Sequence, residues 1–129
     1  MKKGNPPIPT EAELEILRIL WENGRATVKF VNDRINERRE TGYTTTLKLM
    51  QIMAEKGILM RDTEGKSHIY SPAFEEKETQ KILLNKFLDA AFGGSAMKLA
   101  MQLLGNRKTS SKELEQIKEL INKIERGEK

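Results

Sequence analysis

Polar side chains at helical spacing lie in the segment GYTTTLKLMQIMAEKG, residues 42–57, where Thr44, Lys48 and Gln51 stand at i, i+4 and i+7. A lysine can bind a guanine edge or a phosphate, and a glutamine amide can pair with adenine. The short hydroxyls of Thr44 and Thr45 suit phosphate oxygens or the methyl group of thymine. Such residues on one helical face predict a helix that contacts bases in the major groove of duplex DNA.

A second row of this segment is apolar or small and faces the other way. Its members stand at i, i+3, i+4 and i+7, and they are Thr46, Leu49, Met50 and Met53. This spacing predicts a core-facing stripe. Every amphipathic surface helix also has a polar row, so the pattern alone leaves a purely structural interpretation open. On that interpretation, Thr44 and Thr45 only begin the helix.

A charged hairpin is predicted directly after this helix. Gly57 ends the helix, residues 58–62 have the pattern of a strand, and residues 67–71 have the pattern of a returning strand. The pair Glu64-Gly65 between them is typical of a tight turn. A short hairpin with charged residues beside a major-groove helix is the wing of a winged helix-turn-helix domain.

Four further side chains are predicted to contact DNA around that helix. Arg61, Lys66 and His68 are candidates for contacts between the wing and phosphates or the minor groove. Tyr43, just ahead of the helix, is a candidate anchor on the DNA backbone. Glu55 shares the polar face but lies a full turn away from the groove-facing end.

Two shorter helices are predicted before the 42–57 segment. Thr10 and Glu13 form a capping box that opens the first helix, and Asn23-Gly24 ends it. Thr27 caps the second helix, and Arg25-Ala26 leave room for one short edge strand. Their apolar stripes consist of Leu14, Leu17, Leu20 and Trp21 and of Val28, Val31 and Ile35. Three helices and a hairpin in about 65 residues match the order and size of a winged helix-turn-helix.

The chain after Phe74 is predicted to be helical to its end. We expect helices at about 75–92 and 95–105, separated by Gly93-Gly94, and a last helix opened by a capping box of Ser110 and Glu113. The predicted domains are therefore residues 1–73, a DNA-binding domain, and residues 74–129, a helical dimerisation domain. The expected dimer contacts are Phe87, Leu88, Phe92, Met97, Met101, Leu104, Leu114, Ile117, Ile121 and Ile124. Folding back of these helices on the first domain, as a monomer, is the alternative.

Bulk properties permit a polyanion partner without identifying one. The net charge is +4, but residues 1–72 hold 12 Lys/Arg and 10 Asp/Glu, and residues 73–129 hold 11 and 9, so each part carries +2. No segment approaches the roughly 18 apolar residues of a membrane span, and MKKGNPPIPT has no apolar stretch behind its lysines. These features predict a cytoplasmic protein.

The residue types that catalysis or metal binding would need are scarce. The chain has no cysteine and one histidine, so thiolate chemistry is excluded and His68 has no His or Cys to share a metal with. Ser67 and His68 are adjacent on a strand and point apart, which is wrong for a nucleophile and its base. No phosphate-cradling glycine motif is present. The sequence predicts neither an enzyme nor a cofactor-binding protein.

Five segments in order make the chain resemble the penicillinase-repressor family of transcriptional regulators (the BlaI, MecI and CopY type). These are PTEAELEILRILW at 9–21, TVKFVNDRI at 27–35, GYTTTLKLMQIMAEKG at 42–57, GKSHIYSPAF at 65–74 and FLDAAFGGS at 87–95. The resemblance implies a homodimer with N-terminal winged helix-turn-helix domains and interlocking C-terminal helices. It implies repression at a two-fold symmetric operator. In members that control β-lactam resistance, a membrane sensor-protease signals for cleavage in the dimerisation segment, which releases DNA.

Three departures from the family pattern concern DNA reading and signalling. Many relatives have an arginine where this chain has Ile52, which changes the expected operator preference. The Asn-Phe scission pair of the β-lactam-responsive members aligns with Gln102 and Leu103, which are therefore the candidate cleavage region. The cysteine cluster of the copper-responsive branch is absent, which excludes copper sensing by that route. The rival hypothesis is a winged-helix module that binds protein rather than specific DNA.

Overall fold

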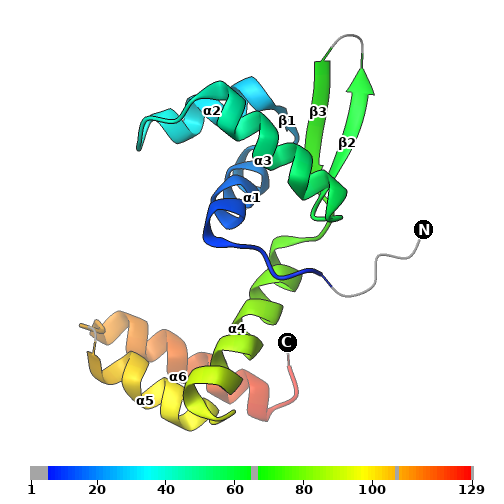
Figure 1. Cartoon of the computed structure of the whole chain (residues 1–129). Helices are drawn as coiled ribbons and strands as arrows, with labels where there is room; N and C mark the ends of the chain where they lie inside the picture. Colours follow the sequence, from blue (N-terminus) through cyan, green and yellow to red (C-terminus); the bar gives the residue numbers. More distant parts are fainter. Residues whose placement is uncertain (1–5, 65–66, 107, 129) are drawn as a thin grey trace. The chain divides into compact units, whose positions relative to one another are not determined.

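The computed structural model describes residues 6–64, 67–106 and 108–128 of the chain (Figure 1). It divides into two compact units, Met1–Asn85 and Lys86–Lys129. The first unit contains three helices, a small sheet and the beginning of a fourth helix; the second contains the end of that helix and two more helices. The predicted fold class, mainly helical with a small hairpin, is confirmed.

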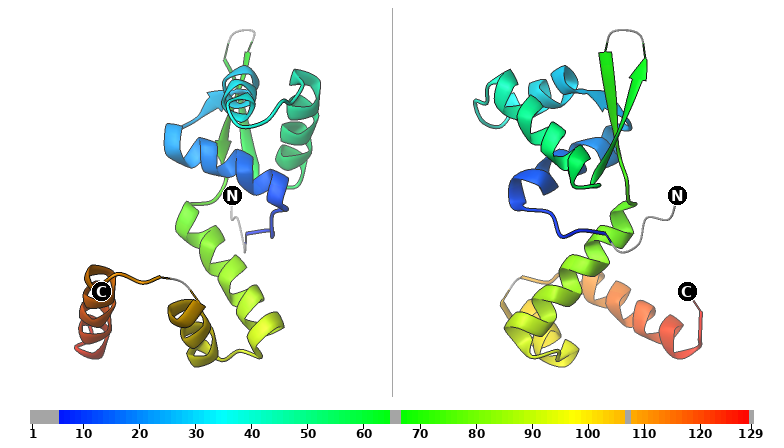
Figure 2. Two further views of the ribbon diagram at one scale, coloured as in Figure 1. Left: turned by 90° about the vertical axis from the view of Figure 1, so that its left-hand side faces the viewer. Right: turned by 45° about the vertical axis from the view of Figure 1, so that its right-hand side comes forward.

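The first unit has the element order of a winged helix-turn-helix. Its elements are α1 Glu11–Asn23, β1 Ala26–Thr27, α2 Val28–Asn36, α3 Tyr43–Glu55, β2 Leu59–Glu64 and β3 Ser67–Pro72. The sheet is antiparallel with the order β1-β3-β2, so the predicted edge strand pairs with the returning strand of the hairpin. Figure 2 shows β2 and β3 as a projecting wing next to the helices. The predicted turn pair Glu64-Gly65 falls partly outside the described residues.

The helix ends use the caps that the sequence predicts. The Thr10 hydroxyl accepts from the Glu13 amide at 3.2 Å, and the Glu13 carboxylate accepts from the Thr10 amide at 2.9 Å. Gly24 ends α1 with φ of +85°, and its amide donates to the Leu20 carbonyl. The Thr27 hydroxyl caps α2 by accepting from the Phe30 amide. Local sequence therefore fixes where these helices begin and end.

The start of β2 differs from the sequence prediction. Ile58 was expected to begin the strand, but its amide donates to the Met53 carbonyl at 2.9 Å and completes the C-terminal closure of α3. The strand begins at Leu59 and extends to Glu64, two residues beyond the predicted end. Ile58 is still buried, so its side chain packs in the core although the residue lies outside the strand.

One core holds the three helices and the sheet together. Its largest fully buried side chains include those of Tyr70, Ile16, Leu20, Met50, Met53 and Val31. Trp21 packs against this core and donates from its indole nitrogen to the Phe74 carbonyl at 3.1 Å. The prediction that Trp21 serves packing is therefore confirmed. The core fixes α3 against the wing, because Met50, Met53 and Tyr70 all belong to it.

A buried carboxylate joins the beginning of α1 to the end of α3. Glu13 is 2% exposed, and one of its oxygens accepts from the Lys56 ammonium at 2.6 Å. Burial raises the pKa of the Glu13 carboxyl, but the hydrogen bonds from Lys56 and from the Thr10 amide outweigh it. The net pKa lies below its ordinary value of 4.5. Sequence reasoning gave Glu13 only a capping role.

Replacing Glu13 with glutamine is expected to lower the free energy of unfolding at neutral pH by about 1 kcal/mol, because the amide keeps a capping acceptor but loses the charge-assisted bond to Lys56. Since the pKa of Glu13 is lower in the folded than in the unfolded chain, its contribution is complete above pH 4.5 and is lost as pH falls through the folded value. Urea unfolding from pH 7 to pH 3 should show the difference between the two proteins shrinking with acidity. A difference independent of pH would contradict this assignment.

The second unit leaves most of its apolar side chains exposed. It contains the end of α4 Glu76–Phe92, α5 Ala96–Asn106 and α6 Ser111–Glu125, and no described residue of α5 or α6 is buried. Gly93 and Gly94, with φ of +57° and +82°, separate α4 from α5, and the Ser110 hydroxyl caps α6. Within the described residues no helix has the length and apolar character to cross a membrane.

The division between the units lies inside α4, whereas the hairpin pattern of the sequence stops at residue 73. Thr79, in the first turn of α4, is 3% exposed, so the beginning of this helix packs within the first unit. Helical periodicity is continuous through 75–92 and carries no signal for such a division. The assignment of residues 74–129 to dimerisation stays a prediction.

Candidate nucleic-acid interface

The helix α3 exposes the polar row and buries the core row that its sequence predicts. Thr44, Lys48 and Gln51 are exposed. On the other side, Thr46, Met50 and Met53 are at most 1% exposed, and Leu49 is half-buried. The helical phase is therefore confirmed, and the groups suited to base contact point to solvent.

The N-terminal end of α3 carries no cap of its own. The N-cap residue is Gly42, which makes no side-chain hydrogen bond, and the first turn holds no acidic residue. Thr44 and Thr45 are exposed in that first turn, and neither of them is the N-cap residue itself. Tyr43 is half exposed beside them. The partial positive charge of the helix end therefore faces outward without an acidic neighbour on α3.

A cleft at this end brings α3 together with α2 and the wing. Its volume is about 610 Å³, and its lining includes Tyr43 from α3, Lys29 from α2 and His68 from β3. Thr27, Val28, Leu47 and Tyr70 complete the wall. The structure thus brings Tyr43 and His68, two of the predicted DNA contacts, to one concave surface.

The ring of His68 is held by its neighbour across the hairpin. The Thr63 hydroxyl lies 2.8 Å from Nδ1 of His68, so Nε2 is the nitrogen left for a partner. When the hydroxyl donates to Nδ1 of the neutral ring, Nε2 carries the proton and can donate to a phosphate oxygen. Among the described residues no group of three or more potential metal ligands is found.

Sequence reasoning missed Lys29 as a candidate contact. Its ammonium forms an ion pair of 2.9 Å with Asp33 one turn later on α2, and both side chains are well exposed. An exposed pair of this kind contributes little to stability, so the ammonium can be shared with a phosphate at small cost. Its position in the first turn of α2 could have identified Lys29 as a contact, because the first helix of a helix-turn-helix meets the DNA backbone.

One other described residue that was predicted to contact DNA from the wing is not part of this cleft. Arg61 is exposed on β2, opposite Tyr70 in the sheet, and does not line it. Lys66 lies outside the described residues. Ile52, beside Gln51 on α3, is 37% exposed and presents an apolar surface where an arginine would present a cation.

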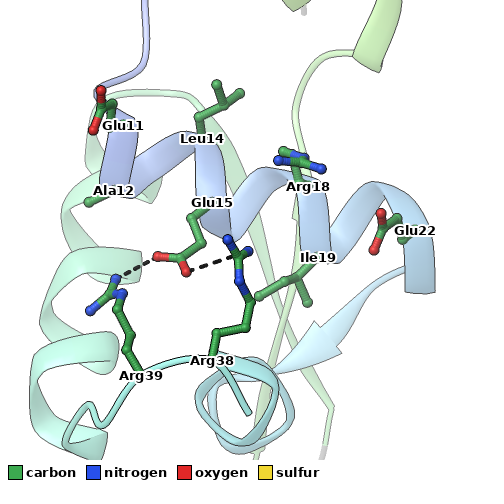
Figure 3. Close-up of a pocket in the computed structure, with 9 residues that line it drawn as sticks. All are labelled: Glu11, Ala12, Leu14, Glu15, Arg18, Ile19, Glu22, Arg38 and Arg39. Atoms are coloured by element: carbon green, nitrogen blue, oxygen red, sulfur yellow. Dashed lines mark hydrogen bonds and ion pairs between the residues drawn. The ribbon is translucent and has the colours of Figure 1, made fainter. Parts of the chain in front are cut away.

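A second depression, on the outer side of α1, is dominated by ion pairs (Figure 3). The Glu15 carboxylate faces Arg38 and Arg39, which come from the turn between α2 and α3. Arg39 also donates to the Thr41 hydroxyl at 3.0 Å. Both guanidinium groups are thus paired with Glu15, and these ion pairs connect α1 to the turn.

Comparison with known proteins bears on what this surface is for. The family model described as penicillinase repressor matches residues 9–123, which is nearly the whole chain. The chain belongs to the penicillinase repressor family. This is a family of transcriptional repressors and not of enzymes, which confirms the sequence-based assignment.

Relatives of this repressor-family protein match most of its length at low identity. The penicillinase repressor of Bacillus licheniformis is 20% identical over 115 residues, covering 89% of this chain and 90% of that protein. The methicillin resistance regulatory protein MecI of Staphylococcus aureus is 21% identical over 88% of this chain and 93% of its own length. The solution structure of the DNA-binding domain of the repressor BlaI aligns with a TM-score of 0.50 and 23% identity, over 57% of this chain and 92% of that domain. This last likeness supports the winged-helix fold.

Proposed function

We propose that this penicillinase-repressor family protein is a homodimeric DNA-binding repressor that acts in the cytoplasm at a two-fold symmetric operator. The observation that carries the proposal is the exposed row of α3 beside the cleft shared by α2, α3 and the wing. Lys48 and Gln51 can reach base edges while Lys29, Tyr43 and His68 hold the adjacent backbone. Arg61 and Lys66 add wing contacts to phosphate.

Dimer formation is supported by the apolar side chains that the second unit leaves in water. Met97, Met101 and Ile124 are between 63% and 69% exposed in the single chain. The other expected contacts that are at least 39% exposed are Phe87, Leu104, Leu114 and Ile121. Leu88, Phe92 and Ile117 are half-buried. Burying a large apolar side chain contributes about 1.5–3 kcal/mol, and this gain supports pairing of two copies through these helices.

Release of the operator is proposed to follow a cut in the dimerisation helices, on a signal from a membrane sensor-protease. The candidate region, Gln102 and Leu103, is exposed on α5. Two joined DNA-binding domains gain affinity from their high effective concentration, and a cut would remove this gain while leaving each domain folded. Incubation of the purified protein with membranes that carry the sensor-protease should produce two fragments. An intact chain after this incubation would contradict this route.

The test of DNA binding is an electrophoretic mobility shift with duplex DNA from the promoter region of the protein's own gene. A repressor dimer should bind one symmetric site tightly and should lose affinity steeply as salt rises. The alternative function, a winged-helix module for protein partners, predicts only weak retardation that is equal for a scrambled duplex. That second outcome would overturn the proposal.

Replacing Ile52 with arginine is expected to strengthen binding to all duplexes, because it places a cation beside Gln51 on the exposed side of α3. Each added phosphate contact should steepen the dependence of log affinity on log salt by about one unit, so two copies should add about two. Fluorescence anisotropy at several salt concentrations measures this slope. The Ile52→Gln variant is the neutral control and should leave the slope unchanged. An equal slope in the arginine variant would remove Ile52 from the interface.

A further inference from the structure

A buried asparagine connects α2 to the helix that is proposed to read DNA. Asn32 lies on α2 and is 8% exposed, and its Nδ2 donates to the hydroxyl of Thr46 on α3 at 2.8 Å. Thr46 itself is 1% exposed. The contact is therefore a polar bond inside the α2–α3 packing, at a place where apolar side chains are the usual choice.

The same asparagine also holds the chain that leads into α3. Its Nδ2 donates to the carbonyls of Thr41 and Gly42, at 3.1 and 3.2 Å. Two amide hydrogens thus serve three acceptors on the turn and on α3, and at least one hydrogen is shared. Both the entry of α3 and its first buried turn are fixed from one side chain.

A second asparagine on α2 grips the same turn. Asn36 donates from Nδ2 to the Thr41 carbonyl at 2.8 Å and accepts from the Thr41 amide at Oδ1 at 3.0 Å. Its amide group therefore pairs with both backbone groups of one residue, as a neighbouring strand would. Asn36 also donates to Oδ1 of Asn32 at 3.3 Å, which links the two asparagines.

We propose that Asn32 and Asn36 form a clasp that sets the entry and rotation of α3, and that they are positioning residues for base recognition. The inference rests on the proposed DNA-binding function. Gly42 gives α3 no cap, so the turn lacks the side-chain bond that usually fixes a helix start. The clasp supplies directional bonds there instead. Apolar packing alone is non-directional and tolerates small rotations of a helix.

The consequence is that Lys48 and Gln51 reach the base edges in one orientation only while the clasp is intact. A bidentate contact with a base needs both of its hydrogen bonds, and a small rotation of α3 breaks one of them. Phosphate contacts by long cationic side chains tolerate such a rotation better. Loss of the clasp should therefore lower affinity for the operator more than affinity for unrelated DNA.

The experiment compares full-length variants on two probes: a duplex selected from a random pool by the wild-type protein, and a scrambled duplex of equal length. Asn32→Leu removes the central amide, and Asn36→Ala removes the second. The double variant Asn32→Leu/Thr46→Val replaces the buried polar pair by an apolar one and restores packing without the directional bonds. Asn23→Ala is the control, because Asn23 donates to the Ile19 carbonyl on α1 and accepts from Arg34 on α2, and neither of these bonds involves α3 or the turn before it.

Each variant is first shown to be folded and dimeric by thermal unfolding and sedimentation. We expect operator affinity to fall about tenfold or more in Asn32→Leu and in the double variant, with affinity for the scrambled duplex within about twofold of wild type. A double variant with wild-type stability and a wild-type ratio of the two affinities would overturn the clasp. Failure of wild type to prefer any selected duplex would instead overturn the proposed function.

Discussion

Replacing Ile121 with glutamate is expected to convert the protein to monomers and to lower its affinity for operator DNA by about 10²- to 10⁴-fold, the gain that bivalent binding usually gives. Ile121 is 50% exposed in the single chain and belongs to the apolar stripe of α6. A dimer would bury two copies of the new carboxylate. Burying unpaired charges costs far more than the lost apolar contacts, so the monomer becomes the stable form.

The charge-matched control is Gln116→Glu, since Gln116 is an exposed residue of α6 outside its apolar stripe. This variant should remain dimeric and should bind operator within about twofold of wild type. Sedimentation at micromolar concentration measures the assembly, and anisotropy with operator DNA measures the affinity. Because α6 lies outside the unit that contains the winged helix, Ile121→Glu should leave the unfolding of the first unit intact. A dimeric Ile121→Glu variant would contradict the proposed interface.

The second large effect is expected at Lys48. Truncation to alanine should weaken operator binding at least about 30-fold, because each half-site loses a contact worth roughly 1 kcal/mol or more and the dimer has two. Lys48 is exposed, so the unfolding temperature should change little. Glu55→Ala is the control on the same face of α3, one turn beyond the expected groove contact.

The probe used with Lys48→Ala separates a base contact from a phosphate contact. A lysine on a guanine edge affects the operator and leaves the scrambled duplex nearly unchanged. A lysine on a phosphate weakens both and makes the salt dependence shallower by about one unit per copy. Unchanged retardation of operator DNA by a folded Lys48→Ala dimer would contradict the assignment of Lys48 as a DNA contact.

Local signals in the sequence determined the elements of the winged domain. The capping box of Thr10 and Glu13, the stop at Gly24 and the cap at Thr27 each depend on residues within four positions, and all appear in the structure. The two rows of α3 follow from helical periodicity in the same way. The predicted start of β2 is one residue too early. A buried apolar residue such as Ile58 fits both the end of a helix and the beginning of a strand, so burial does not distinguish the two.

The arrangement of the candidate interface could be predicted only in part. Thr44, Lys48 and Gln51 share a helical face, so periodicity was enough to group them. Lys29 and His68 are far apart in sequence and meet Tyr43 at one cleft only because α2, α3 and β3 pack together. No periodic pattern connects residues so far apart in the sequence, so the sequence does not predict that these side chains lie together.

The sequence by itself determined the family, the order of the elements and the face of α3 that meets solvent, since these depend on short-range caps and periodic burial. Only the tertiary structure decided which polar groups are buried together. The sequence carries no signal that Asn32 is buried, and it assigns Glu13 a capping role alone. Packing placed the first against Thr46 and the second against Lys56, because hydrogen-bond partners inside a core are selected by how helices cross and not by local sequence.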